Sequence, residues 1–139
     1  MKRIGGSAEL TTAMRCGVFK TAIPVLHVRS SKAAEEFYCK KLGFRRQFAY
    51  RVDEKEADPC YMALVRDSAW LHISSFLGDG VSGGVVRFEV EDVDAIHAEL
   101  AEKGVGIDTG PVDQTWGTRE MYVRDADGNS IRFIRPIDG

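Results

Sequence analysis

Short stretches of alternating hydrophobic and polar residues predict strands in the first half of the chain. The predicted strands cover residues 22–29, 44–52, 60–66 and 69–76. The last two form a hairpin that turns at Asp67-Ser68. Between the first two strands, apolar residues recur at helical spacing over residues 32–42, where Ser30-Ser31 caps the start and Gly43 follows the end. The predicted order of elements is β-α-β-β-β.

The second half of the chain repeats this order. Residues 77–84 hold four glycines and predict a linker. The elements predicted after it are a strand at 85–90, a helix at 93–103, a short strand at 105–108, a loop through Gly110-Pro111, and a hairpin of strands 119–124 and 130–134. The glycines after the two helices are 61 residues apart (104 − 43), and both hairpins contain Val-Arg-Asp. This pattern indicates an internal duplication.

The duplication predicts an α+β fold in which two tandem βαβββ modules form a curved, cleft-enclosing mixed sheet with the helices outside. We expect an N-terminal extension at 1–20 and a single domain at 21–139. The domain would consist of module one at 21–76, the linker at 77–84 and module two at 85–136. Each module has one helix to cover one face of its sheet, so the remaining faces form a shared cleft, which is the default binding site.

Period-two alternation assigns side chains to this cleft. The cleft residues on the strands are predicted to be Ile23, Val25, His27, Arg29, Phe48, Tyr50, Trp70, His72, Ser74, Val85, Arg87, Glu89, Ser130, Arg132 and Ile134. In the last hairpin, Glu120 and Tyr122 lie on the opposite side from Met121 and Val123. A slip of one residue in any strand would exchange its two faces.

Composition excludes several classes of function. The 139 residues carry a formal net charge of −2 and no basic stripe, so a nucleic-acid partner is not expected. No stretch is long and apolar enough for a membrane span. Cys16, Cys39 and Cys60 are far apart and odd in number, which favours free thiols in a reducing cytoplasm.

Residues 1–20 begin with basic residues but lack the apolar run of a signal peptide. Gly5-Gly6-Ser7 indicates a mobile start. Two explanations for the segment stay open: Met14 is an alternative initiator, or the segment covers a partner subunit.

The last hairpin carries a specific pattern. Its turn is Asp125-Ala126-Asp127-Gly128-Asn129, in which Asp and Asn bond the local backbone and Gly128 allows a tight turn. The hairpin resembles the closing hairpin of the vicinal-oxygen-chelate superfamily of glyoxalases, extradiol dioxygenases and bleomycin resistance proteins. Trp116-Gly117-Thr118-Arg119-Glu120 is most similar to the bleomycin-resistance branch. The resemblance covers residues 21–136 and implies the glyoxalase/bleomycin resistance fold and a homodimer with pockets at the subunit interface.

The resemblance also bears on metal binding. Matching the motifs of the metal-dependent members places their ligand positions at Ile23, His72, Val85 and Arg132. Only His72 can ligate, because two of the side chains have no donor atom and arginine is a permanent cation. His27 lies about 13 Å along the strand from the first position, at ~3.3 Å per residue. We therefore expect neither a metal nor another cofactor, which excludes the metal-dependent activities of the superfamily.

Several residues have both a functional and a structural interpretation. Trp116 matches a ligand-stacking tryptophan of bleomycin resistance proteins, and Phe48 matches an aromatic pocket residue there; alternatively, Trp116 seals the end of the core. His27 and His72 are either a polar pair that binds an anion or moves protons, or hydrogen-bonded residues of the cleft wall.

Arg119 and Glu120 either pin their loop through an ion pair or touch the ligand. The predicted ligand-binding residues are Trp116, Phe48, His72, His27, Arg132, Tyr50, Arg87, Glu89, Glu120 and Tyr122. No catalytic residue is predicted, since phosphate-loop, triad and nucleophile-elbow motifs are missing from the sequence.

We therefore predict a cytoplasmic protein that sequesters a bleomycin-like antibiotic or another partly aromatic small molecule. The first alternative is an enzyme of the lyase, isomerase or dioxygenase type with an altered or metal-free site, in which His72 or His27 acts as general base. The second alternative is a ligand-sensing or scaffold module.

Overall fold

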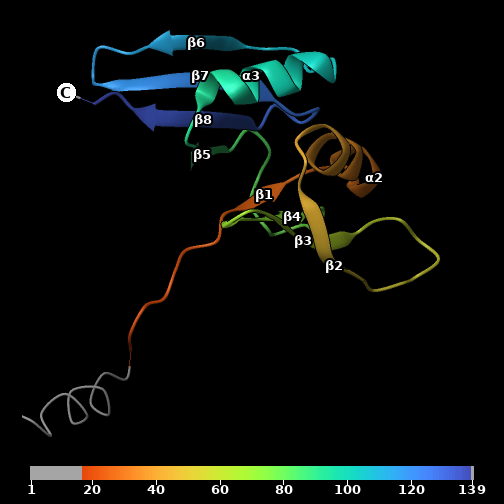
Figure 1. Cartoon of the computed structure of the whole chain (residues 1–139). Helices are drawn as coiled ribbons and strands as arrows, with labels where there is room; N and C mark the ends of the chain where they lie inside the picture. Colours follow the sequence, from red (N-terminus) through yellow and green to blue (C-terminus); the bar gives the residue numbers. More distant parts are fainter. Residues whose placement is uncertain (1–16, 139) are drawn as a thin grey trace, which may run out of the picture.

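The structure, a computed structural model, describes residues 17–138 as two four-stranded sheets with one helical segment each (Figure 1). The first sheet has the order β1-β4-β3-β2, with β1 at Val25–His27, β2 at Arg45–Arg51, β3 at Cys60–Arg66 and β4 at Ala69–Ser74. The second has the order β5-β8-β7-β6, with β5 at Val85–Glu89, β6 at Thr109–Asp113, β7 at Thr118–Arg124 and β8 at Ser130–Pro136. In each sheet the first and last strands of the module pair in parallel and the other pairs are antiparallel. The predicted α+β fold class of two βαβββ modules is confirmed.

A capped helix follows the first strand of each module. In module one, α2 (Ser31–Ala34) continues directly into the π-helix η1 (Glu35–Lys41). In module two, α3 covers Val93–Glu102. The side chains of Ser30 and Asp92 accept hydrogen bonds from the backbone N–H groups three residues later, at 3.1 and 3.0 Å. These bonds satisfy amides that a helix start leaves without partners.

The helix-facing positions of both sheets build one hydrophobic core. Its fully buried side chains include Tyr38, Leu42, Met62, Leu64, Leu71, Ile73, Leu100, Met121 and Ile131. Burying one such aliphatic side chain stabilises the fold by roughly 1.5–3 kcal/mol. Phe44 of module one contacts Phe88 of module two with ring centroids 5.6 Å apart, so the core crosses the boundary between the modules.

Polar contacts also join the two modules. The Tyr38 hydroxyl on η1 donates to Asp125 Oδ2 at 2.6 Å, and Arg66 at the end of β3 forms two 2.9 Å hydrogen bonds with Glu99 on α3. Each contact links a helix of one module to a turn or a strand end of the other module. We call the sheet faces that the two helical segments leave uncovered the open face, one part of it in each module. The sheets meet near β1 and β5 (Figure 1), where Asn129 donates to the backbone oxygen of His27 at 2.9 Å.

The sixth strand differs from the prediction. A strand was expected at 105–108 with a loop through Gly110-Pro111, but β6 begins at Thr109 and includes both residues. Since β6 is an edge strand with a register shift, the missing N–H of the proline is tolerated. A side chain at position 110 would collide with the backbone oxygen of Glu120, which explains the glycine.

The predictions for the cysteines and the N-terminal segment concern residues that are only partly within the described region. Cys39 and Cys60 are free thiols as predicted, whereas Cys16, Met14 and Gly5-Gly6-Ser7 lie outside the described residues. No helix within residues 17–138 combines the length and apolar character that a bilayer crossing requires.

Candidate functional site

The open face of module one is predominantly aromatic. Phe48 and Tyr50 are exposed at 51% and 56%, and Trp70 on β4 is exposed at 42%. Their strands place them opposite the helix side, as the alternation predicted, and a bulge between Arg46 and Phe48 sets the register of β2. Tyr50 stacks on Phe76, with ring centroids 6.1 Å apart. This surface offers flat apolar contact area that no helix covers.

One polar pair interrupts this aromatic surface. The Tyr61 hydroxyl lies 2.8 Å from His72 Nδ1, and the ring of Phe48 meets His72 edge-on at 6.4 Å between centroids. Burial lowers the pKa of His72 below its usual 6.5 and raises the pKa of the Tyr61 phenol. At neutral pH the pair is therefore uncharged, and its proton position depends on the histidine tautomer.

The structure does not pair the two histidines with each other, which was one of the two interpretations left open by the sequence. His72 has Tyr61 as its partner, whereas His27 Nδ1 is buried without a hydrogen-bond partner among residues 17–138. His27 is level with Ser74, and His72 with Val25, so the histidines are two residues out of step on neighbouring strands. The polar group that the structure assembles here is Tyr61 with His72.

The open face of module two is organised around the buried carboxylate of Glu120, which is fully inaccessible to solvent. Arg87 donates two hydrogen bonds to it at 3.3 and 3.2 Å, and the Tyr122 hydroxyl donates at 2.6 Å. The Trp116 indole N–H donates at 3.0 Å, and the Thr118 hydroxyl also donates. Burial alone would raise the pKa of Glu120, but these donors outweigh burial and lower it from 4.5 to about 2.

Trp116 is held in place yet remains 63% exposed. It lies in the turn between β6 and β7, where Gly117 adopts a φ of +94° and Gln114 N–H donates to Thr118 O at 2.7 Å. Only the indole N–H points into the protein, toward Glu120. This exposure does not fit a tryptophan that seals the core, and it leaves a flat ring surface available.

Arg132 and Tyr122 form a second fixed feature of this face. The Arg132 guanidinium lies 4.3 Å from the centroid of the Tyr122 ring, and its Nε–H donates to Ser130 Oγ at 3.2 Å. The hydrogen bond to Glu120 raises the pKa of Tyr122, which keeps the phenol neutral. Glu89 is exposed on β5, two residues beyond Arg87.

Arg119 and Glu120 do not pair with each other. Arg119 donates instead to Asp94 at 3.0 and 2.9 Å and to Asp113 at 2.8 Å, so it ties the start of β7 to α3 and β6. Glu120 faces the opposite side of the strand. The loop is therefore pinned on both sides of β7, by Arg119 with two aspartates on one side and by Glu120 with Arg87 on the other.

Two participants in these networks were not predicted from the sequence. Tyr61 lies in the almost continuously apolar strand β3, where alternation gives no face assignment. Tyr61 pairs with Ser74 across the first hairpin, and alternation assigns Ser74 to the open face. The register of the hairpin could therefore have placed Tyr61 on that face as well. Thr118 precedes Glu120 by two residues, and period-two alternation alone would have placed the two side by side.

The positions that hold metal in related proteins do not fit a metal centre here. Ile23 and Val85 have no donor atoms and Arg132 is a cation, so His72 is the single residue of the four that could ligate a metal. Within residues 17–138, no three His, Cys, Asp or Glu side chains converge as a metal site would require.

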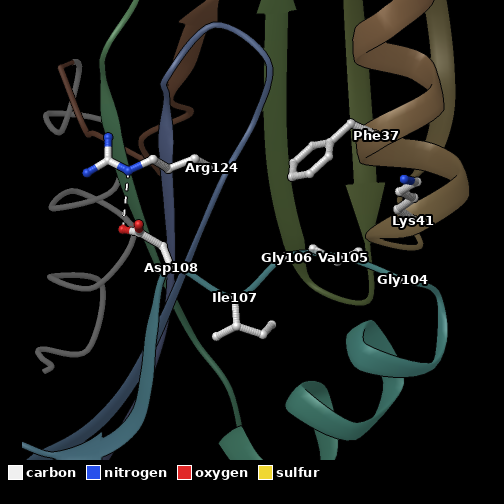
Figure 2. Close-up of a pocket in the computed structure, with 8 residues that line it drawn as sticks. All are labelled: Phe37, Lys41, Gly104, Val105, Gly106, Ile107, Asp108 and Arg124. Atoms are coloured by element: carbon white, nitrogen blue, oxygen red, sulfur yellow. Dashed lines mark hydrogen bonds and ion pairs between the residues drawn. The ribbon is translucent and has the colours of Figure 1, made fainter.

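Two cavities lie between the modules, and the larger one is lined in part by Arg87 and Glu89. One of about 330 Å³ lies between η1, the segment 104–108 and Arg124, which pairs with Asp108 at 3.2 Å (Figure 2). The other, of about 760 Å³, lies at the module boundary between Phe44, the turn at Asp67-Ser68 and β5. Neither is lined by Trp116, His72 or Arg132.

Comparison with known proteins places the chain in a family. A sequence profile described as "Glyoxalase superfamily protein" matches residues 7–139. The chain belongs to the glyoxalase superfamily. The predicted resemblance is therefore confirmed at the level of the superfamily.

Individual relatives agree with this assignment. The bleomycin resistance protein of Geobacillus stearothermophilus is 28% identical over 130 residues, which cover 84% of this chain and 96% of that protein. The uncharacterized protein YraH of Bacillus subtilis (strain 168) is 37% identical over 64 residues, which cover 45% of this chain and 50% of YraH.

Solved structures share the fold of this glyoxalase-superfamily chain. TnmS3, an antibiotic binding protein from Streptomyces sp. CB03234, matches with a TM-score of 0.70 at 23% identity, over 88% of this chain and 99% of TnmS3. A superfamily member from Sphaerobacter thermophilus DSM 20745 matches with a TM-score of 0.68 at 20% identity, over 86% and 99% of the two chains.

Proposed function

We propose that this protein binds and sequesters an antibiotic or another partly aromatic small molecule on its open face, without metal or other cofactor. Sequestration requires affinity and no chemical step. The relatives named as a bleomycin resistance protein and as an antibiotic binding protein support a binding role. The ligand-contacting residues in this proposal are those predicted from the sequence, centred on Trp116.

The observation that carries the proposal is the way Glu120 holds Trp116. A buried ionised carboxylate is costly unless donors surround it, and here five donated hydrogen bonds do so. One of those donors is an indole whose ring remains exposed. A tryptophan that served only the core would be covered, so this arrangement favours a preformed stacking surface.

The open face also supports a dimer. Large apolar side chains on it are exposed in the single chain: Ile23, Val25, Phe48, Tyr50, Trp70, Val85, Val112 and Trp116. An apolar surface of this kind marks an interaction site. In the proposal, a second copy closes the open face, and the ligand occupies the interface between the two subunits.

Calorimetric titration of the full-length protein with metal-free bleomycin and with its copper complex tests the proposal. We expect saturable binding to the wild type, and about tenfold weaker binding by Trp116→Ala because the stacking surface is lost. Val81→Ala, which removes an exposed apolar side chain in the inter-module segment, is the control. Failure of both forms to bind would refute the bleomycin assignment, and unchanged affinity of Trp116→Ala would refute the stacking role.

A second function is favoured by one observation, the pairing of Tyr61 with His72. A neutral histidine hydrogen-bonded to a phenol can act as a general base in a metal-free enzyme. In that case His72→Gln would abolish turnover of a substrate while leaving its binding measurable. For sequestration alone, a bound molecule would be recovered chemically unchanged after prolonged incubation, as mass spectrometry would show.

A further inference from the structure

The charges on the open face of module two do not balance locally. Arg87 is neutralised by Glu120, with the two side chains 3.2 Å apart. Arg132 is level with Arg87 on the neighbouring strand, and within residues 17–138 no carboxylate lies within 4.0 Å of its guanidinium. Glu89 is the nearest acidic residue along β5, and it forms no ion pair with Arg132. The group of Arg87, Glu120 and Arg132 therefore carries one uncompensated positive charge.

Arg132 is also fixed in position with unused donors. Its guanidinium lies over the Tyr122 ring, and its Nε–H is bonded to Ser130. Of the five N–H donors of an arginine, only this one has a partner among the described residues. The remaining four belong to the two terminal nitrogens, which form the fork that binds carboxylates and phosphates in a bidentate manner.

The exposed indole and the tyrosine ring beneath the unpaired guanidinium are hydrogen-bonded to the same carboxylate. Glu120 Oε2 accepts from Trp116, and Glu120 Oε1 accepts from Tyr122, on whose ring Arg132 lies. Glu120 remains ionised over the whole neutral range, since its pKa is lowered to about 2. One hydrogen-bonded network therefore holds both the flat apolar surface of Trp116 and the tyrosine ring on which the cation lies.

We propose that Arg132 binds an anionic group of the ligand, such as a carboxylate, while the planar body of the same ligand stacks on Trp116. This inference rests on the proposed binding function and narrows its ligand to planar aromatic anions. A neutral isostere loses the charge-assisted pair of hydrogen bonds. A cationic analogue meets Arg132 and the nearby Arg87 as like charges.

Three matched probes test the inference by calorimetry on the full-length protein at neutral pH. They share the naphthalene ring and differ in charge: 2-naphthoate is an anion, 2-naphthamide is neutral, and 2-naphthylmethylammonium is a cation. We expect 2-naphthoate to bind at least tenfold more tightly than the amide and the cation to bind most weakly. Added salt should weaken the binding of the anion more than that of the amide.

Variants on β8 assign the effect to Arg132. Arg132→Gln should lower the affinity for 2-naphthoate by at least tenfold and leave the affinity for 2-naphthamide within twofold of the wild type. Arg135→Gln removes the same charge from the other face of the same strand and should leave both affinities unchanged. Arg132→Lys keeps the charge without the fork and should retain only part of the preference for the anion.

The outcomes separate this inference from the proposed function. If the amide binds as tightly as 2-naphthoate, or if Arg132→Gln still prefers the anion, the anion site is refuted while aromatic binding stands. If none of the three probes binds the wild type, but bleomycin does, the inference fails and the binding function survives. If neither the probes nor bleomycin bind, both fail together.

Discussion

The two modules have the same strand order but differ on their open faces. Module one presents exposed aromatic rings, and its polar group is the uncharged pair of Tyr61 and His72. Module two presents a buried ionised carboxylate, Glu120, with two arginines and a tryptophan arranged around it. On their helix sides the modules are alike, since both bury branched and aromatic side chains in one shared core.

This difference shows how two copies of one fold can carry different side-chain chemistry on equivalent surfaces. The helix side must remain apolar in both copies because it forms the core. The open face is free of that constraint, so one copy can supply apolar contact area and the other can supply charge and orientation. In the proposed function, module two specifies the ligand, and module one adds affinity through stacking and burial.

The largest loss of stability is expected from removing the charge of Glu120. Glu120→Gln places an amide where five donated hydrogen bonds converge, and its NH₂ group faces other donors. We expect the free energy of unfolding to fall by about 2–3 kcal/mol. Urea denaturation measures this, with Glu102→Gln, an exposed carboxylate at the end of α3, as the control. A loss below about 1 kcal/mol would show that the network of module two is weak.

The buried carboxylate of Glu120 should also make the free energy of unfolding depend on pH. The folded pKa of Glu120 is about 2 and its usual value is 4.5, so its contribution to stability is complete above about pH 4.5. That contribution is lost as the pH falls from about 4.5 toward 2. The difference in unfolding free energy between wild type and Glu120→Gln should therefore shrink over this range. Other carboxyl groups titrate in both proteins and cancel, and a difference that stays constant down to pH 3 would contradict the assigned pKa.

A smaller loss of stability is expected from a substitution in module one. Tyr61→Phe removes a single hydrogen bond from a half-buried pair and should cost less than about 1 kcal/mol of unfolding free energy. Because burial is the cause of the lowered pKa of His72, its NMR titration midpoint should lie below 6.5 in both the wild type and this variant. A midpoint above 6.5 would mean that the environment of His72 stabilises the charged imidazolium.

Much of the fold follows from local patterns in the sequence. Alternation places Phe48, Tyr50 and Arg87 on the open face, and Ser30 and Asp92 cap the helices as expected. These features depend on neighbours within a few residues, which the sequence displays directly. The duplication adds the order of strands, because a pattern that occurs twice constrains each copy.

The remaining features depend on contacts between elements. Alternation assigns Glu120 to the open face but cannot show that Trp116 and Arg87 cover it completely. Gly110-Pro111 predicts a loop by its local chemistry, yet β6 accepts both residues because an edge strand pairs on one side only. The sequence does not show which carboxylate each arginine meets, so it could not distinguish the neutralised Arg87 from the unpaired Arg132.

We propose that module two specifies the ligand through Trp116 and Arg132. A crystal structure of the full-length protein with 2-naphthoate tests it most directly. We expect the naphthalene ring to stack on the Trp116 indole, with the carboxylate within about 3 Å of the terminal nitrogens of Arg132. A ligand found in the cavity between Phe44 and β5, or a carboxylate directed at the pair of Tyr61 and His72, would contradict it.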